Sequence, residues 1–307
     1  MNDIGLTLGI DIGGTNIAFG IVNQLGEIVF EANISTKSVK NPALLPELIN
    51  AHIQDFKIES IGIGAPSSNT YSGMIENAPN LNWGPNIPIV QHFQDYFKLT
   101  TKLTNDANAA AVGEKLFGAA KDFSDFVVIT LGTGLGAGIF INNSLFNGKF
   151  GTAGEFGHVM VENNGRPCGC GRKGCLETYC SATGMLKSIQ LLAHVDKEKS
   201  DIPNMENPKP EDIFKAAQSG DAFAEKIVDF TAEKLGYWLA NFTCFSNPEA
   251  FILFGGIAKN GAYFREKVNH YTQINLLNLY QGKVKVKSSE LHLKNAAILG
   301  AAAYAKY

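Results

Sequence analysis

Residues 6–22 read LTLGIDIGGTNIAFGIV, and this stretch decides the fold. Two apolar segments, Leu6 to Ile10 and Ile17 to Val22, flank a turn that contains Gly13 and Gly14. Short apolar runs on either side of a glycine pair predict two strands joined by a tight turn. A glycine pair of this kind is usually only a hairpin turn, so this one motif by itself does not indicate a function.

Glycine turns of this kind let backbone N–H groups approach phosphate oxygens, because no Cβ stands in the way. Asp11 adds a carboxylate that can hold Mg²⁺ through water, and Thr15 adds a hydroxyl donor. The pattern recurs about one domain length later as VVITLGTGLGAGIFI at residues 127–141, with Thr130 where Asp11 stood. The repeat predicts two similar domains that face each other across a cleft.

A third glycine pair follows the apolar strand predicted at residues 251–254, and bare backbone there would let an adenine ring lie flat. Neither the Rossmann fingerprint nor the P-loop fits any of the three turns. The residues predicted to bind the nucleotide are Asp11, Gly13, Gly14, Thr15, Asn16, Gly132, Thr133, Gly134, Gly255 and Gly256.

The remaining pattern predicts an α/β protein. We expect a buried strand at residues 61–65, an alanine-rich helix at 107–116, helical structure over 214–245 and a surface excursion at 196–212. Alternating lysine and valine at 283–287 indicates an edge strand with one charged face. A second alanine-rich helix, at 295–307, is expected to return to the first domain. The predicted division is therefore 1–117 plus 291–307 for a smaller domain and 118–290 for a larger one.

Composition excludes several classes of protein. Among 307 residues, 45% are hydrophobic and 18% charged, which is typical of a globular chain. A net charge of −3 and a pI near 6.1 provide no general attraction to nucleic acid or an acidic membrane. No signal peptide or membrane-spanning segment is predicted, so we expect a cytoplasmic protein with neither nucleic acid nor membrane as a partner.

Three of the five cysteines lie within eight residues, in CGCGRKGC at 168–175. With His158 ten residues earlier, Cys168, Cys170 and Cys175 form a set of one nitrogen and three thiolates. Four protein ligands suit a structural Zn²⁺ and leave no open position for catalysis. Cys180 and Cys244 are interpreted as core thiols.

At this point the sequence resembles the ROK family of bacterial sugar kinases and repressors, which has the actin-like ATPase (ribonuclease H-like) fold. The resemblance covers nearly the whole chain. It is carried by DIGGT at 11–15, NDANAAA at 105–111, GTGLG at 132–136, GxxGExGH at 151–158 and CxCGxxGCLE at 168–177, of which the last two are the most specific.

The resemblance implies an ATP-dependent hexose kinase with Mg²⁺ and structural Zn²⁺, usually a homodimer, in which Asp106 is the general base. Glucose is the first candidate substrate, because residues 176–184 look most like glucokinase members. Without the other motifs, Asp106 would be interpreted as the N-cap of a helix rather than as a base. The residues implied to contact the sugar are Asn80, Asn105, Asp106, Glu155, His158 and Glu177.

Other functions remain open at this stage. Kinases for N-acetylmannosamine, N-acetylglucosamine, fructose or allose use the same pattern, and polyphosphate could replace ATP. A sugar-sensing regulator without catalysis is a further alternative. The family's repressors carry a helix-turn-helix before the DIGGT strand, which here begins near Leu6, so we expect an enzyme.

Overall fold

The computed structural model describes residues 5–78, 80–193, 200–291 and 295–307. The chain divides into two compact units. The first unit contains Met1–Asp122, Leu145–Ala153 and Glu290–Tyr307, and the second contains Phe123–Ser144 and Gly154–Ser289.

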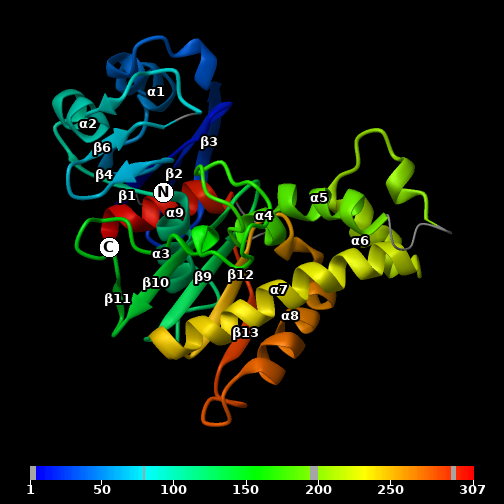
Figure 1. Cartoon of the computed structure of the whole chain (residues 1–307). Helices are drawn as coiled ribbons and strands as arrows, with labels where there is room; N and C mark the ends of the chain where they lie inside the picture. Colours follow the sequence, from blue (N-terminus) through cyan, green and yellow to red (C-terminus); the bar gives the residue numbers. More distant parts are fainter. Residues whose placement is uncertain (1–4, 79, 194–199, 292–294) are drawn as a thin grey trace. The chain divides into compact units, whose positions relative to one another are not determined.

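The first unit is built on a five-stranded sheet in the order β3-β2-β1-β4-β8 (Figure 1). Its strands are β1 (Leu6–Ile12), β2 (Asn16–Val22), β3 (Ile28–Ser35), β4 (Ile58–Gly64) and β8 (Thr100–Thr104). β1 pairs antiparallel with β2 and parallel with β4, which in turn pairs parallel with β8. The predicted hairpin and the buried strand after it are confirmed.

Within its described residues, this unit has the α-helices α1 (Leu45–Ile53), α2 (Ile89–Phe97), α3 (Asp106–Phe117) and α9 (Ala296–Lys306). α9 packs on β1, β4 and α3, which confirms that the last helix returns to the first sheet. Gly9 and Gly62 are register partners, and a Cβ on either would overlap a carbonyl oxygen of α9. The alanine-rich helix can therefore lie directly against the sheet backbone.

Smaller elements complete the first unit. The 3₁₀ helices η1 (Thr36–Ser38) and η2 (Pro42–Leu44) follow β3. β5 (Ser68–Asn69), β6 (Met74–Glu76) and β7 (Asn86–Ile87) form a three-stranded sheet that the sequence pattern did not predict. Strands of two or three residues are too short to show a period.

The second unit repeats the topology of the first in the order β11-β10-β9-β12-β13. The strands are β9 (Phe126–Leu131), β10 (Leu135–Ile141), β11 (Ser144–Leu145), β12 (Ala250–Phe254) and β13 (Lys285–Ser288). β9 pairs antiparallel with β10 and parallel with β12, just as β1 does with β2 and β4. The recurring sequence motif thus corresponds to a recurring fold, and β13 is the edge strand predicted from alternating lysines.

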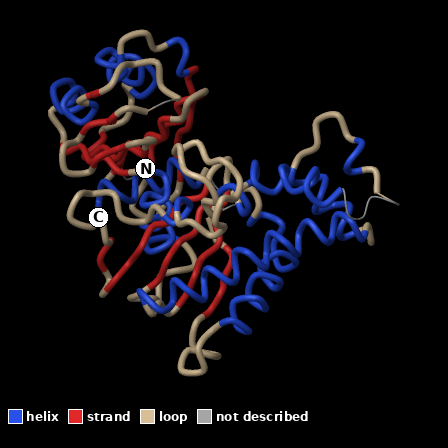
Figure 2. The backbone as a smooth tube through the Cα atoms, viewed as in Figure 1, coloured by secondary structure: helices blue, strands red, loops and turns tan. Residues whose placement is uncertain are grey.

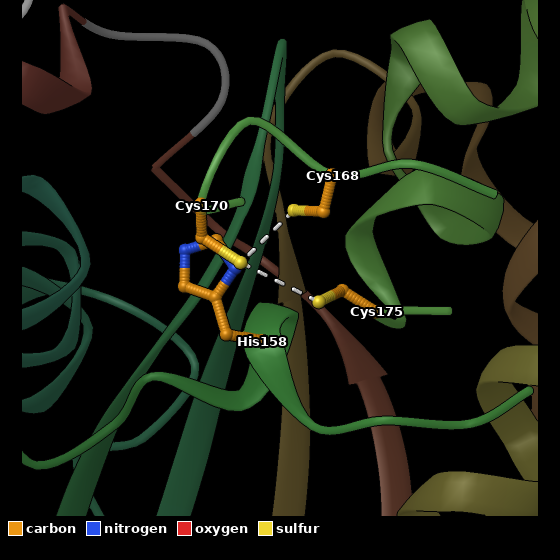
Figure 3. Close-up of side chains that lie close together, drawn as sticks. All are labelled: His158, Cys168, Cys170 and Cys175. Carbon is orange, nitrogen blue, oxygen red and sulfur yellow. Dashed lines mark hydrogen bonds between the residues drawn. The ribbon is translucent and has the colours of Figure 1, made fainter. Parts of the chain in front are cut away.

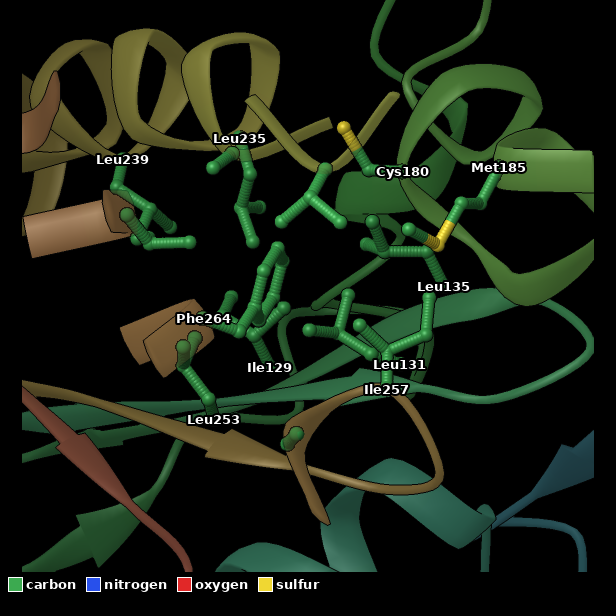
Figure 4. Close-up of a cluster of buried hydrophobic side chains, with 14 of the residues drawn as sticks. Ile129, Leu131, Leu135, Cys180, Met185, Leu235, Leu239, Leu253, Ile257 and Phe264 are labelled. Atoms are coloured by element: carbon green, nitrogen blue, oxygen red, sulfur yellow. The ribbon is translucent and has the colours of Figure 1, made fainter. Parts of the chain in front are cut away.

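Helices α7 (Ala222–Ser246) and α8 (Gly261–Asn275) lie side by side against this sheet (Figure 2). Figure 4 shows the core beneath them, in which Ile129 and Leu131 meet Leu235 and Phe264. The unit's other helices are α4 (Glu177–Cys180), α5 (Ala182–Ala193), α6 (Pro210–Gln218), η3 (Phe156–His158), η4 (Ile202–Asn204) and η5 (Ala258–Asn260). No helix within the described ranges is both long enough and apolar enough to span a membrane.

The structure differs from the predicted pattern in two helical regions. The expected helical stretch 214–245 is two helices, because Gly220 has a φ of +90° and Asp221 caps the start of α7 by accepting from the Ala224 N–H at 2.9 Å. Of the predicted excursion at 196–212, residues 196–199 lie outside the described residues, and the rest contains η4 and the start of α6.

A third difference concerns residues 145–153, which the predicted division assigned to the second domain but which belong to the first unit. Side chains hold the segment there. The Tyr71 hydroxyl donates to the Gly148 carbonyl at 2.9 Å, and the Asn108 amide donates to the Asn147 side chain at 3.2 Å.

Candidate functional site

In the first unit, the polar side chains gather at the carboxyl edge of the parallel strands. Asp11 near the end of β1 is in register with Gly64 of β4, which is in register with Thr104 of β8. Ligands of open α/β sheets bind at this edge. Burial, followed by the negative charge of Asp106, raises the pKa of Asp11 from 3.8 to about 6. The two carboxylates are thus electrostatically coupled.

Asp106 is the first residue of α3, but it does not cap the helix. Asn105 is the N-cap, and its side chain accepts from the Asn108 N–H at 2.7 Å. The Asp106 carboxylate accepts from the Ala107 N–H at 2.9 Å, and the residue is exposed to solvent. Neighbouring protein atoms nevertheless desolvate the carboxyl and raise its pKa, against the lowering effect of the Ala107 N–H. Because Asn105 does the capping, Asp106 is available for chemistry.

The first glycine turn packs against a predicted sugar residue. Gly13 donates to the Asn16 carbonyl at 2.9 Å, while Thr15 and Asn16 are exposed. A Cβ on Gly14 would lie 3.0–3.2 Å from three atoms of Asn80, which is itself exposed. A substitution at Gly14 would therefore disturb Asn80 as well as the turn.

The second glycine turn joins β9 to β10. The Gly132 N–H donates to the Gly134 carbonyl at 3.1 Å, and Thr133 is exposed at the tip. A Cβ on Gly132 would meet no atom within 4 Å, so glycine is not required there by packing. Glycine is required at Gly255, because its φ is +103° and a Cβ there would lie 2.6 Å from the Leu131 carbonyl. A Cβ on Gly256, by contrast, would face open space.

His158, Cys168, Cys170 and Cys175 point toward one another, with every possible ligand atom within 4.8 Å of the others (Figure 3). The sulfurs of Cys170 and Cys175 are 3.7 Å apart, and His158 Nδ1 is 3.6 Å from the Cys168 sulfur. A tetrahedral Zn²⁺ separates two thiolates by about 3.8 Å and a thiolate from an imidazole nitrogen by about 3.6 Å. The four residues therefore fit a structural zinc ion.

The chemistry of these side chains agrees with their spacing. Arg172, first through its backbone N–H and then through its guanidinium, lowers the pKa of Cys170 to about 6, which favours the thiolate that a metal binds. Burial raises the pKa of Cys175 to about 12, so metal binding there must displace a proton. Of the two cysteines interpreted as core thiols, Cys180 is buried, but Cys244 is exposed, so that prediction was wrong for Cys244.

The predicted sugar residues of this unit lie beside the cluster of His158 and the three cysteines. His158 Nε2, the nitrogen that faces away from Cys168, is 3.8 Å from the exposed carboxylate of Glu155. Glu177 places Oε1 3.9 Å from the Cys168 sulfur and accepts from the Leu135 N–H through Oε2 at 3.0 Å. Glu177 thus contacts both the cluster and the strand that follows the second glycine turn.

Sequence reasoning missed the residues that support these side chains. Arg172 donates to the His158 carbonyl at 2.8 Å, and Arg166 donates to the carbonyls of Thr178 and Gly184 at 2.8 and 2.9 Å. Arg166 also stacks on the Tyr179 ring. An arginine that contacts backbone carbonyls has no signature in the sequence, since any loop arginine looks the same.

Comparison with known proteins identifies the family of the chain. The model of the ROK family matches residues 7–307. A glucokinase of Halalkalibacterium halodurans is 35% identical over 268 residues, which cover 83% of this chain and 81% of the relative. A xylose repressor of Caldicellulosiruptor bescii is 34% identical over 310 residues, which cover 97% of this chain and 77% of the relative.

Among solved structures, a ROK family glucokinase from Streptomyces griseus, in complex with glucose and AMPPNP, superimposes with a TM-score of 0.83 at 32% identity. The match covers 98% of this chain and 99% of that one. The two repeated sheets therefore represent the actin-like ATPase fold of these kinases. The relatives include both sugar kinases and repressors, and with a family match over nearly its whole length the chain belongs to the ROK family.

Proposed function

We propose that the protein transfers the γ-phosphoryl group of ATP to a hexose, with glucose to glucose 6-phosphate as the first candidate reaction. The observation that carries the proposal is Asp106, a solvent-accessible carboxylate that Asn105 frees from capping and whose raised pKa suits a base. The glucokinase relatives and the glucose complex of the Streptomyces griseus enzyme support glucose as the substrate.

In the proposed reaction, Asp106 orients a sugar hydroxyl and accepts its proton as the hydroxyl oxygen bonds to the γ-phosphorus. The bond between that phosphorus and the β–γ bridging oxygen breaks, and ADP leaves. Asp11 would hold Mg²⁺ through water, and the metal would neutralise phosphate charge during the transfer. The remaining requirement is positioning, for which the glycine turns at 13–14 and 132–134 supply backbone N–H groups.

Recognition of the sugar is proposed for the residues identified from the sequence. Glu155 and Glu177 offer carboxylate oxygens to hydroxyl groups, and Asn80 offers an amide that both donates and accepts. His158 would bind zinc through Nδ1 and face the sugar through Nε2, whose partner in the structure is Glu155. Asn105 contributes only its amide N–H₂ group, because its oxygen caps α3.

The second candidate function is sugar sensing without catalysis, and the observation that favours it is the similarity to xylose repressors. Asp11 and Asp106 argue against it, because a sensor needs neither a metal-binding carboxylate nor a base. Within the kinases, an N-acetylhexosamine, fructose or allose could replace glucose, and polyphosphate could replace ATP. A homodimer is also proposed, which light scattering on the purified protein would test.

Coupled ADP release over a panel of these sugars, with Mg-ATP or polyphosphate, tests the proposal directly. We expect turnover with glucose, and we expect Asp106→Asn to lower kcat by about 10²–10⁴-fold while glucose and ATP still bind. Asp55→Asn, an exposed aspartate of the same unit, is the matched control. No turnover with any sugar would favour the sensor, and an Asp106→Asn protein with most of its activity would remove Asp106 as the base.

A further inference from the structure

The turn at residues 132–134 is held by the segment that follows the last zinc ligand. Three hydrogen bonds connect them. Glu177 accepts from the Leu135 N–H at 3.0 Å, and the Ala182 N–H donates to the Gly132 carbonyl at 2.9 Å. The Thr183 hydroxyl donates to the Thr133 carbonyl at 2.9 Å. The metal-binding loop and the turn are therefore parts of one hydrogen-bonded structure.

These bonds determine which backbone groups of the turn remain available. The carbonyls of Gly132 and Thr133 are already occupied by donors from residues 182 and 183. Within the described residues, the N–H groups of Thr133 and Gly134 make no hydrogen bond. A turn whose carbonyls are occupied and whose N–H groups are free attracts anions. The segment at 177–183 thus fixes the turn in the arrangement that a phosphate requires.

Glu177 lies close both to the glycine turn and to a cysteine of the metal cluster. Its Oε2 atom would lie 2.6 Å from a Cβ placed on Gly134, so the carboxylate and the turn fit only because residue 134 is a glycine. Its Oε1 atom lies 3.9 Å from the sulfur of the zinc ligand Cys168. Glu177 is also only two residues beyond Cys175, which is fully buried. Movement of the metal loop would therefore carry this carboxylate with it.

We propose that Glu177 is a positioning residue that couples the zinc-binding loop to the phosphate-binding turn, so that loss of the metal weakens nucleotide binding even when no sugar is present. The inference rests on the proposed function, in which residues 132–134 bind phosphate. It adds a role for the metal loop in nucleotide binding to the role in sugar binding proposed above.

The charge of Glu177 and its hydrogen bond to Leu135 should change nucleotide affinity in opposite directions, so two substitutions can separate them. A carboxylate near a phosphate repels it, so removal of the charge alone would strengthen nucleotide binding. Loss of the hydrogen bond to Leu135 would weaken binding, because the turn is no longer fixed. Glu177→Ala removes both the charge and the acceptor, whereas Glu177→Gln removes the charge and keeps an acceptor oxygen.

The test is calorimetric titration of AMPPNP with Mg²⁺ into the purified protein in the absence of sugar. We expect Glu177→Ala to bind about 10-fold more weakly than the unmodified protein, and Glu177→Gln to bind equally well or more tightly. Protein from which a chelator has removed the zinc is expected to bind as weakly as Glu177→Ala. Asn163→Ala, an exposed position between the proposed ligands His158 and Cys168, is the matched control and should leave AMPPNP affinity unchanged.

Further variants separate the possible failures. In Gly132→Ala the added Cβ lies in open space, so a loss of AMPPNP affinity would come only from obstruction of the phosphate. Unchanged affinity would mean that the turn does not bind phosphate. If Gly132→Ala weakens binding but neither Glu177→Ala nor zinc removal does, the coupling is wrong. If Glu177→Ala does not fold, Thr183→Val removes a second support of the turn; weaker AMPPNP binding would sustain the proposal, and unchanged binding would overturn it.

Discussion

Replacement of Asp11 by Asn is expected to stabilise the protein at neutral pH while it abolishes turnover. Burial and the charge of Asp106 raise the pKa of Asp11 from 3.8 to about 6, so the folded state favours the neutral carboxyl. The stability that such a carboxyl contributes is fully present below the pKa that it has in the unfolded chain. It is lost as the pH rises through the pKa that it has in the folded protein. The rise in the pKa of Asp11 from 3.8 to about 6 corresponds to about 3 kcal/mol, and partial solvent access reduces this to about 1–3 kcal/mol.

The assay is urea denaturation of the unmodified protein and Asp11→Asn at several pH values from 4 to 8. The variant should gain about 0.5 kcal/mol or less at pH 4 and about 1–3 kcal/mol in the free energy of unfolding above pH 7. Asp55→Asn, an exposed position of the same unit, should change the free energy by less than about 0.5 kcal/mol throughout. A variant that is less stable at pH 7.5, or a difference that is constant over the whole range, would refute the reasoning.

Two further predictions concern the metal and the packing of the last helix. Cys175→Ser should hold much less than one zinc per chain by elemental analysis and should lose glucose binding in calorimetry; a variant that is free of zinc yet binds glucose normally would contradict the proposed role of the metal. Gly62→Ala places a Cβ against the Ala301 carbonyl and should lower the free energy of unfolding by about 3 kcal/mol or more, whereas Gly132→Ala should be nearly neutral in the same urea titration.

The sequence was informative wherever a local pattern corresponds to one structure. Apolar runs around glycine turns predicted both hairpins, and their repetition matched the repeated strand order of the two sheets. The three cysteines and His158 predicted a cluster whose spacing fits zinc. In each of these cases the decisive residues are close in the sequence or repeat with a fixed period, so that no knowledge of packing was required.

Prediction was weaker where two neighbouring residues can perform the same task or where the partner is distant. Asn105 and Asp106 are both good capping residues, and only the structure shows that Asn105 caps α3. The bond between Glu177 and the Leu135 N–H spans 42 residues and uses a backbone donor that every residue except proline has. Such a contact leaves no trace in the sequence, although it changes the role of Glu177.

The two units share a topology, yet their turns differ in a way that the proposed chemistry requires. Thr130 takes the place of Asp11 in the second unit, and its hydroxyl accepts from the Gly136 N–H at 3.1 Å, so it is committed to the hairpin. Asp11 instead remains a titratable carboxylate, which would repel a phosphate unless a cation lies between them. In the proposed function, the turn of the first unit would suit a metal-bound phosphate, and the turn of the second unit would suit a phosphate held by backbone N–H groups alone.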